Sequence, residues 1–407
     1  MTEPDAYPIL SVEEARARIL GMCVPLPSET VPILESLDRV LAEGIWADRD
    51  VPPQDNSAMD GYAVRAADLV AEPPIRLRVV AEVAAGHPTD AVIGPGEAAR
   101  IMTGAFVPAG ADTVVRFEDT TSGDGWVEVR RIPAPGRNVR HRGEDVQQGQ
   151  LVLPPGTRVR PQEIGMMASL GRTRVAVHRR PRVAILATGD EIVPASEEPG
   201  PGQIRNINSY SNAAQVLRAG GLPILLGVAS DRRDELSAAL RRGLDARADL
   251  FITSGGVSVG DFDLVKQVLS AEGEMSFWWV NMKPGKPVAF GTLAGIPLLG
   301  LPGNPVSAMI AFELFARPAI CRMLGLSVAD PPSVRARLVS SIERKDGRRH
   351  YLRVRLHRQG EDCLAELTGD QGSGILSSMV AADGLAVIPE DCSYLPAGSF
   401  VQVILLE

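Results

Sequence analysis

Apolar runs and polar turns alternate with a spacing that changes along the chain and predicts separate segments. Ser11 followed by Glu14 forms a capping box, which predicts a short helix over 11–22. A second short segment at 32–41 and an extended stretch near Trp46 follow. Residues 151–180 are typical of short strands with one helix at 161–170.

Residues 48–149 have a different pattern. Short apolar runs at 75–83, 114–117 and 126–129 alternate with turns rich in glycine, proline and aspartate. This spacing is typical of a small all-β module.

Residues 181–328 alternate between strongly apolar strands and helical patterns. Strands are predicted at 183–186, 224–228, 250–253 and 297–301, and helices at 211–219, 234–244 and 262–271. This alternation predicts a doubly wound sheet of parallel strands. Asn304 and Pro305 then begin a long helix toward Met323. Beyond the linker at Pro331–Pro332, residues 333–407 alternate like a small β domain.

Length, charge and composition narrow the function classes. A chain of 407 residues is too long for one hydrophobic core. A net charge of −8 and only 4% aromatic residues argue against a nucleic-acid binder, despite local runs of arginine. No apolar run is long enough for a membrane helix, and the acidic N-terminus lacks a signal-peptide core. The four widely spaced cysteines favour a reduced, cytoplasmic chain.

Polar loops follow each predicted strand of the 181–328 segment. In an open α/β sheet, the carboxyl ends of parallel strands share one edge, and ligands bind there. Small residues let backbone N–H groups approach a phosphate, and helix N-termini behind the loops add partial positive charge. The candidate ligand-binding residues are Thr188, Gly189, Asp190, Ser254, Gly255, Gly256, Ser258, Pro302, Gly303 and Asn304.

Carboxylates stand among these loops. Glu191, Asp231 and Asp263 supply hard oxygen ligands, and carboxylates facing a phosphate require a cation such as Mg²⁺ between them. The pattern therefore indicates a nucleotide phosphate with its metal ion. The competing interpretation treats these acids as helix caps and the glycines as ordinary turns.

Lys283-Pro284-Gly285-Lys286-Pro287 places two lysines on a proline-glycine turn. Lysine acts as a point charge toward oxyanions, so the turn is a candidate cationic site. The alternative is a solvent-exposed hairpin tip. The chain has no Walker loop and no nucleophile–His–Asp arrangement, which argues against covalent catalysis.

The predicted β module contains three polar clusters of its own, at 56–63, 100–105 and 139–145. Each is a weak signal alone, because an Asp-Gly turn is usually only a turn.

Taken together, the motifs resemble the molybdopterin molybdenumtransferase family, also called MoeA, which includes the E domain of gephyrin. The motifs span nearly the whole chain in the family's order: NSAMDGYA (56–63), RIMTGA (100–105), RHRGEDV (140–146), ATGDE (187–191), SGGVSVGDFD (254–263), KPGKP (283–287) and LPGNPVS (301–307).

The resemblance implies four domains and a homodimer. The expected limits are 1–50 with 146–180 for a discontinuous elongated domain and 51–145 for an inserted β domain. They are 181–328 for the α/β molybdopterin-binding domain and 329–407 for a C-terminal β-barrel. The active site is expected between the α/β domain of one subunit and the β domain of the other.

The resemblance also implies residue roles. Asp60, Thr103 and Asp145 are expected to act from the partner subunit. Glu191, Asp231 and Asp263 are expected in the adenylate, metal and pterin cleft. Lys283 and Lys286, with Arg353 and Ser373, are expected to contact molybdate. One departure is Trp279, which stands where many relatives carry a basic residue.

The implied activity transfers molybdate to adenylylated molybdopterin, molybdopterin-AMP, with release of AMP and with Mg²⁺ as the divalent cation. Transient partners are expected to be the molybdopterin adenylyltransferase and chaperones of molybdoenzymes. Two alternatives stay open. One is molybdopterin adenylylation with ATP, although such proteins usually lack the motifs at 56–145. The other is a gephyrin-like scaffold without enzymatic activity.

Overall fold

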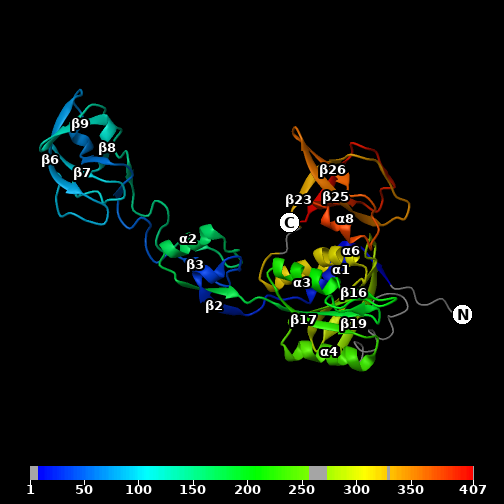
Figure 1. Cartoon of the computed structure of the whole chain (residues 1–407). Helices are drawn as coiled ribbons and strands as arrows, with labels where there is room; N and C mark the ends of the chain where they lie inside the picture. The colour runs from blue at the N-terminus through cyan, green and yellow to red at the C-terminus, as the bar shows by residue number, and fades with distance from the viewer. Residues whose placement is uncertain (1–7, 256–272, 328–330, 407) are drawn as a thin grey trace.

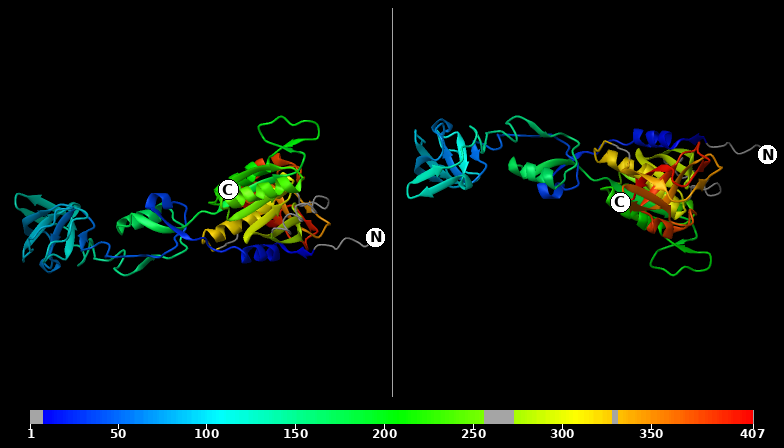
Figure 2. Two further views of the ribbon diagram at one scale, coloured as in Figure 1. Left: turned by 90° about the horizontal axis from the view of Figure 1, so that it is seen from below. Right: turned by 90° about the horizontal axis from the view of Figure 1, so that it is seen from above.

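The structure is a computed structural model, and it describes residues 8–255, 273–327 and 331–406. The molecule is elongated (Figure 1). A β module with strands β6 to β9 lies at one end, a smaller segment with β2, β3 and α2 lies in the middle, and the α/β layer with the C-terminal strands forms the other end. The two views in Figure 2 show the same separation.

The α/β layer is built on a seven-stranded sheet in the order β1-β19-β21-β22-β18-β14-β17. Its strands are β1 (Ile9–Leu10), β14 (Arg182–Thr188), β17 (Leu222–Ala229), β18 (Leu250–Ser254), β19 (Gly273–Val280), β21 (Pro287–Leu293) and β22 (Ile296–Leu301). The four predicted strands are β14, β17, β18 and β22, and they pair in parallel as expected.

The sheet as a whole is mixed rather than parallel. β21 runs antiparallel to both β19 and β22. Ala294 and Gly295, both with positive φ, form the two-residue turn between β21 and β22. Such a turn fits the twist of an antiparallel hairpin, whereas parallel strands need a longer crossover.

Helices cover both faces of the sheet, so the doubly wound arrangement is confirmed. α4 (Arg233–Asp245) packs on one face, where Leu236 and Leu240 meet Ala184 and Phe251. The other face carries α1 (Val12–Gly21), α3 (Asn208–Arg218), α6 (Pro305–Ala311), a π-helical turn η4 (Phe312–Ala316) and α7 (Arg317–Met323). The predicted helix at 262–271 lies outside the described residues.

The N-terminal elements belong to this layer. Glu14 N–H donates to Ser11 Oγ and Ser11 N–H donates to the Glu14 carboxylate, so the predicted capping box is confirmed. Ile19 of α1 is buried in the core of the α/β layer, and β1 pairs with β19. The resemblance assigned residues 1–50 to the elongated domain. Within that range, the apolar side chains of α1 and β1 contact the α/β layer.

The middle segment contains two short antiparallel pairs and a helix. β2 (Ser28–Pro32) pairs with β13 (Arg174–His178), and β3 (Ile45–Trp46) pairs with β12 (Leu151–Leu153). The segment also contains η1 (Ile33–Ser36) and α2 (Pro161–Ser169), and a separate small core joins these parts. The chain passes from this segment into the β module and back, which makes the segment discontinuous in sequence.

The β module has a six-stranded sheet in the order β8-β5-β7-β6-β10-β9. Its strands are β5 (Gly61–Val64), β6 (Ile75–Val83), β7 (Glu97–Ile101), β8 (Thr113–Arg116), β9 (Thr120–Gly123) and β10 (Trp126–Val129). A short pair, β4 (Asn56–Ser57) with β11 (Val139–Arg140), and two turns, η2 (Ala66–Asp68) and η3 (Phe117–Asp119), complete it. Apolar side chains alternate between two cores, as the period of two in a strand requires.

The C-terminal strands close into a five-stranded barrel, because β25 pairs with both β26 and β27, and β23 and β29 complete the ring. The strands are β23 (Ser333–Leu338), β25 (Arg349–Gln359), β26 (Asp362–Leu367), β27 (Gly384–Ile388) and β29 (Phe400–Leu405). β24 (Ile342–Glu343) pairs with β28 (Tyr394–Leu395), and α8 (Leu376–Val380) packs nearby. The predicted barrel is confirmed, whereas the predicted limits of all four segments stay a prediction.

Two short strand pairs lie beside these larger sheets. β20 (Met282–Lys283) pairs in parallel with β25, so the lysine turn of the α/β layer is tied to the barrel. β15 (Ile192–Val193) pairs with β16 (Ile204–Arg205) beyond the carboxyl end of β14. Both pairs lie next to the cavity described below.

Candidate active site

A cavity of about 740 Å³ lies where β14, β18 and β22 end. The three strands are parallel, so their final residues, Thr188, Ser254 and Leu301, lie along one edge of the sheet. The predicted residues that line the cavity are Thr188, Gly189, Glu191, Asp231, Ser254, Gly255, Lys283, Lys286, Pro302, Gly303, Asn304 and Ser373. The tertiary structure therefore brings loops separated by more than a hundred positions to one site.

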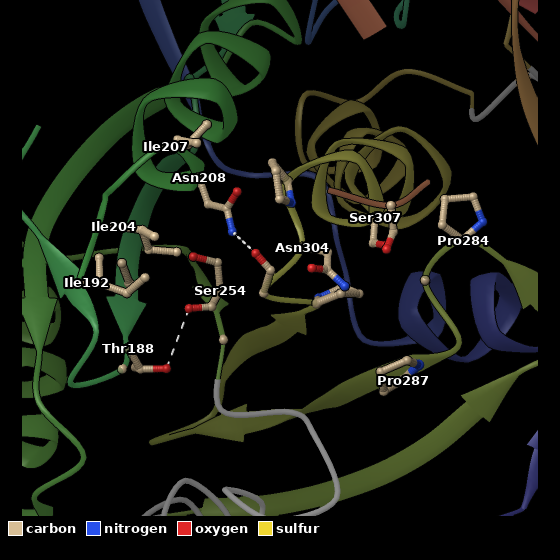
Figure 3. A pocket seen from close by; sticks show the side chains of 18 of the residues that line it. Thr188, Ile192, Ile204, Ile207, Asn208, Ser254, Pro284, Pro287, Asn304 and Ser307 are labelled. Carbon is tan, nitrogen blue, oxygen red and sulfur yellow. Dashed lines mark hydrogen bonds between the residues drawn. The ribbon is translucent and has the colours of Figure 1, made fainter. Parts of the chain in front are cut away.

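Glycine is required where the first and third loops meet. Gly255 has φ +89°, and a Cβ there would lie 2.5 Å from the backbone oxygen of Thr188. The close approach leaves room only for backbone, which is the arrangement that glycine-rich ligand loops use. Thr188 Oγ1 donates to the carbonyl of Ser254 at 3.5 Å, and Asn208 Nδ2 donates to the carbonyl of Gly303 at 2.7 Å (Figure 3).

Two carboxylates of the predicted metal set line the cavity, Glu191 and Asp231. Asp190 does not line it. Its carboxylate accepts the backbone N–H of Asp231 at 3.0 Å, so Asp190 orients the second loop rather than facing the ligand. Within the described residues no group of three metal-ligating side chains is found. Gly256, Ser258 and Asp263 lie outside the described residues. Two hard oxygen donors fit a weakly held, water-rich Mg²⁺ site.

The two lysines of the KPGKP turn both line the cavity, but their surroundings differ. Lys283 Nζ lies 3.2 Å from a carboxylate oxygen of Asp346. Lys286 Nζ lies 3.5 Å from the centroid of the Trp279 ring. Gly285 between them has φ +97°, a conformation that favours glycine, and it also lines the cavity.

Asp346, which belongs to the barrel, accepts hydrogen bonds from three side chains near the cavity. Its carboxylate accepts from Lys283 at 3.2 Å, from Arg348 at 2.7 Å and from the buried His350 at 2.7 Å. Burial opposes the charge on Asp346, but the bonds from His350, Arg348 and Lys283 outweigh it and hold the pKa of Asp346 well below its ordinary value. Burial in turn lowers the pKa of His350, with Asp346 opposing that shift.

Arg353 is placed differently from the prediction. Its side chain is fully buried and does not line the cavity. The guanidinium donates to Ser378 Oγ at 3.0 Å and to the carbonyls of Asp370 and Gly372 at 3.3 and 2.9 Å. The prediction that Arg353 directly contacts an anion in the cavity is therefore wrong. Arg353 instead supports the 370–373 loop, and Arg348 provides the cationic lining from the barrel.

Ser373 does line the cavity, on the loop that Arg353 supports. The Ser373 carbonyl accepts the backbone N–H of Val306 at 3.1 Å, which joins the barrel loop to the start of α6. The barrel thus completes one wall of the cavity through Arg348, Gln371, Gly372 and Ser373.

Asp60, Thr103 and Asp145 do not reach this cavity within one chain. They belong to the β module and its junction, at the far end of the elongated molecule (Figure 1). The Asp60 carboxylate accepts both the backbone N–H and the hydroxyl of Thr103, each at 2.7 Å. These two bonds lower the pKa of Asp60 and fix an exposed, ionised carboxylate.

Asp145 lies at the junction of the β module with the middle segment. Its backbone N–H donates to the Val51 carbonyl at 3.0 Å, and its side chain is exposed. Neighbouring Arg142 bonds Asp50 through Nε at 2.5 Å and Asp55 through its backbone N–H at 2.7 Å. Part of the RHRGEDV motif therefore braces the two chain crossings between segments.

Sequence reasoning missed several lining residues. Ile192, Ile204 and Ile207 form an apolar wall, and Asn206 and Asn208 precede or begin α3 (Figure 3). Ser307 and Arg348 were missed as well. The pair of asparagines before a helix was a visible signal, whereas the apolar wall depends on the β15–β16 pairing that the sequence did not predict.

A second cavity, of about 1,300 Å³, lies between the middle segment and the α/β layer. Arginines line it, but Arg39 pairs with Glu29 and Arg179 pairs with Asp249. It contains none of the predicted site residues. The smaller cavity therefore remains the candidate active site.

Fold and site together define a multidomain α/β protein with a cavity for an anionic ligand at the carboxyl edge of its sheet. The particular family follows from comparison with known proteins. Residues 10–171 match the MoeA N-terminal region (domain I and II), residues 184–322 match a probable molybdopterin binding domain, and residues 335–406 match the MoeA C-terminal region (domain IV). The chain belongs to the MoeA family.

Individual relatives agree over nearly the full length. A molybdopterin molybdenumtransferase of Nostoc is 37% identical, covering 98% of this chain and 94% of its own. One of Haemophilus influenzae is 35% identical, covering 97% and 98%. A solved molybdopterin biosynthesis moeA protein from Pyrococcus horikoshii is 32% identical with a TM-score of 0.85, covering 98% and 100%.

No helix in the described part of the chain has the length and apolarity that crossing a membrane requires. All four cysteines are unpaired. The predicted cytoplasmic location stays a prediction.

Proposed function

We propose that this chain is a molybdopterin molybdenumtransferase, which places molybdate on molybdopterin-AMP and releases AMP. One observation carries the proposal: Lys283 and Lys286 line the same cavity as the glycine-containing loops at Gly189, Gly255 and Gly303. The relatives that match over their full length are named for the same transfer.

The cavity has separate regions for the parts of such a substrate pair. Backbone N–H groups of the loops after β14, β18 and β22 suit the phosphate of the adenylylated pterin, and the apolar wall of Ile192, Ile204 and Ile207 suits a flat ring. Molybdate is placed at the opposite wall, where Lys283, Lys286 and Arg348 offset its two negative charges.

The protein's part in the reaction is positioning and charge stabilisation. Holding molybdate beside the pterin sulfurs makes their encounter intramolecular, and each cationic contact contributes about 1.5–3 kcal/mol as a charge-assisted hydrogen bond. A Mg²⁺ ion held by Glu191 and Asp231, with Asp263 as the third expected ligand, supplies positive charge beside the phosphate. Asp190 keeps the Asp231 loop in place through its backbone bond.

Asp60, Thr103 and Asp145 are proposed to act on the cavity of a partner subunit in a homodimer. The single chain holds Asp60 rigidly through two bonds from Thr103 while leaving it exposed far from the cavity. A two-fold dimer places the same pair of surfaces together twice, so two shared sites result. Sedimentation should show a dimer, and a fully active monomer would contradict the shared site.

The direct test incubates the pure chain with molybdopterin-AMP, molybdate and Mg²⁺. AMP release should depend on molybdate and yield a cofactor that activates an apo-molybdoenzyme. A parallel reaction with molybdopterin and ATP tests the alternative activity. Adenylylated product there, without molybdate-dependent AMP release in the first reaction, would replace the proposal with molybdopterin adenylylation.

A further inference from the structure

Trp279 contacts a lysine of the cavity without lining the cavity itself. Lys286 is among the lining residues and Trp279 is not. The Lys286 ammonium lies over the Trp279 ring, 3.5 Å from its centroid. Trp279 can therefore influence a ligand in the cavity through Lys286.

The backbone fixes this contact. Trp279 lies on β19 opposite Pro287 of β21, one residue beyond Lys286. The backbone N–H of Val280 donates to the Lys286 carbonyl at 2.8 Å, so both residues are held by the same strand pair. Trp278 points into the core, where it stacks on Phe290 at a centroid distance of 6.0 Å. Because side chains alternate along a strand, Trp279 takes the opposite face, the one with Lys286.

An aromatic ring and a carboxylate both attract an ammonium group, but only the carboxylate offsets its charge. Asp346 pairs with Lys283 and offsets its charge. The Trp279 ring attracts Lys286 through its quadrupole and carries no net charge, so the full positive charge of Lys286 stays available. Within the described residues no ion pair joins Lys286 to a carboxylate, whereas Lys283 has one.

We propose that Trp279 is a positioning residue that holds the Lys286 ammonium extended at the cavity wall, ready for a doubly charged tetrahedral oxyanion. The inference rests on the proposed function, which identifies that anion as molybdate. Without the ring, the four-carbon stem of Lys286 samples more rotamers, and each binding event must order it again.

The test compares Trp279→Leu, which removes the aromatic face, with Trp279→Phe, which retains it. In the complete assay, Trp279→Leu should raise the molybdate concentration for half-maximal rate about three- to tenfold, as the loss of one cation–π contact implies. Its kcat and its requirement for molybdopterin-AMP should stay within about twofold of the parent. Trp279→Phe should restore most of the molybdate affinity.

A matched control exists in the β module. Trp126 carries the Arg76 guanidinium 4.0 Å from its ring centroid, so Trp126→Leu removes an equivalent contact far from the cavity. Trp126→Leu should leave the molybdate requirement unchanged. Equal molybdate requirements in the parent and Trp279→Leu would overturn the inference. An equal rise in Trp279→Leu and Trp279→Phe would also overturn it, because the ring would then only fill space.

A binding measurement separates this inference from the proposed function. Titration of the full chain with molybdate alone, followed by calorimetry, should show weaker binding in Trp279→Leu than in Trp279→Phe. If the parent binds molybdate with this ranking but releases no AMP in the assay, the proposed activity fails and the positioning role stands. If the ranking is absent while AMP release is normal, the positioning role fails alone.

Discussion

The cavity of the α/β layer and the inserted β module both present charged side chains, but they organise them differently. At the cavity, Asp346 from the barrel pairs with the lining residues Lys283 and Arg348, and the Lys286 ammonium lies over the Trp279 ring. In the module, Asp60 is held by Thr103 from the same module and faces solvent. The cavity residues are therefore positioned by contacts from within the same chain. In the proposed homodimer, this exposed, rigid carboxylate faces the cavity of the partner subunit.

The largest expected effect concerns Asp60 of the β module. Asp60→Ala should lower the rate of molybdenum insertion at least about 100-fold, as removal of one preorganised group from an active site commonly does. The fold should stay intact, with at most a small fall in the unfolding midpoint, because Asp60 is exposed and only its two bonds from Thr103 are lost. The measurement is AMP release together with a thermal unfolding scan. Asp124→Ala, another exposed acid of the module, is the matched control and should be active.

A mixing experiment decides whether Asp60 acts across subunits. Asp60→Ala and Lys286→Ala chains, each inactive or impaired alone, are unfolded together and refolded. If sites are shared in a two-fold dimer, about a quarter of the parent activity should return from mixed dimers. No recovery, with mixed dimers demonstrated by mass, would place Asp60 and Lys286 at the same site of one chain and break the comparison.

The second-largest expected effect concerns the cavity of the α/β layer. Lys286→Ala should raise the molybdate requirement about 10- to 100-fold, because one charge-assisted contact is lost. The requirement for molybdopterin-AMP should change little. Initial rates over a range of molybdate concentrations measure this. Lys345→Ala removes an ammonium that pairs with Glu343 on the surface and serves as the control. An unchanged molybdate requirement in Lys286→Ala would remove this residue from the oxyanion site.

The smallest expected effect is a change in the free energy of unfolding when an ion pair is removed from each region. The pKa of Asp346 is lowered in the folded chain, so its charge stabilises the fold above its ordinary pKa of about 3.9 and this stabilisation is lost as pH falls through the lower, folded value. Asp346→Asn should cost roughly 1 kcal/mol at pH 7, and the difference should shrink below about pH 4.

Glu82→Gln is the module counterpart. Glu82 pairs with Arg100 at 3.2 Å, with both side chains largely exposed, so its loss should change stability little at any pH. Unfolding midpoints of the full chains at pH 7, 5 and 3.5 make the comparison. Two outcomes would show that Asp346 does not stabilise the cavity wall. One is a difference in unfolding midpoint between the parent and Asp346→Asn that does not narrow in acid. The other is a difference no larger than that for Glu82→Gln.

The strands and their ligand-facing loops were predictable because their signals are local. The apolar runs at 183–186, 250–253 and 297–301 predicted the parallel strands, and the rule that such strands share a carboxyl edge predicted the glycine-rich cavity. Strands β19 and β21, and with them their antiparallel pairing, were not predicted from the sequence.

Arg353 shows where a motif alone misleads. Its sequence position matched an oxyanion contact, but the barrel turns its guanidinium inward to three acceptors of the 370–378 region, and Arg348 lines the cavity instead. An arginine in a strand can point to either face, and a shift of one residue reverses the face. Closure of the barrel, rather than the composition of the strand, decides which arginine reaches the ligand.

The sequence by itself determined the family, the α/β layer, the loops that carry small and acidic residues, and the two lysines, because each depends on residues close together in the chain. Only the tertiary structure decided that Asp346 from the barrel pairs with Lys283, that Trp279 carries Lys286, and that Asp60 stands far from both. The physical reason is that pairing across segments depends on how separate hydrophobic cores dock, and no local pattern encodes the distance between two cores.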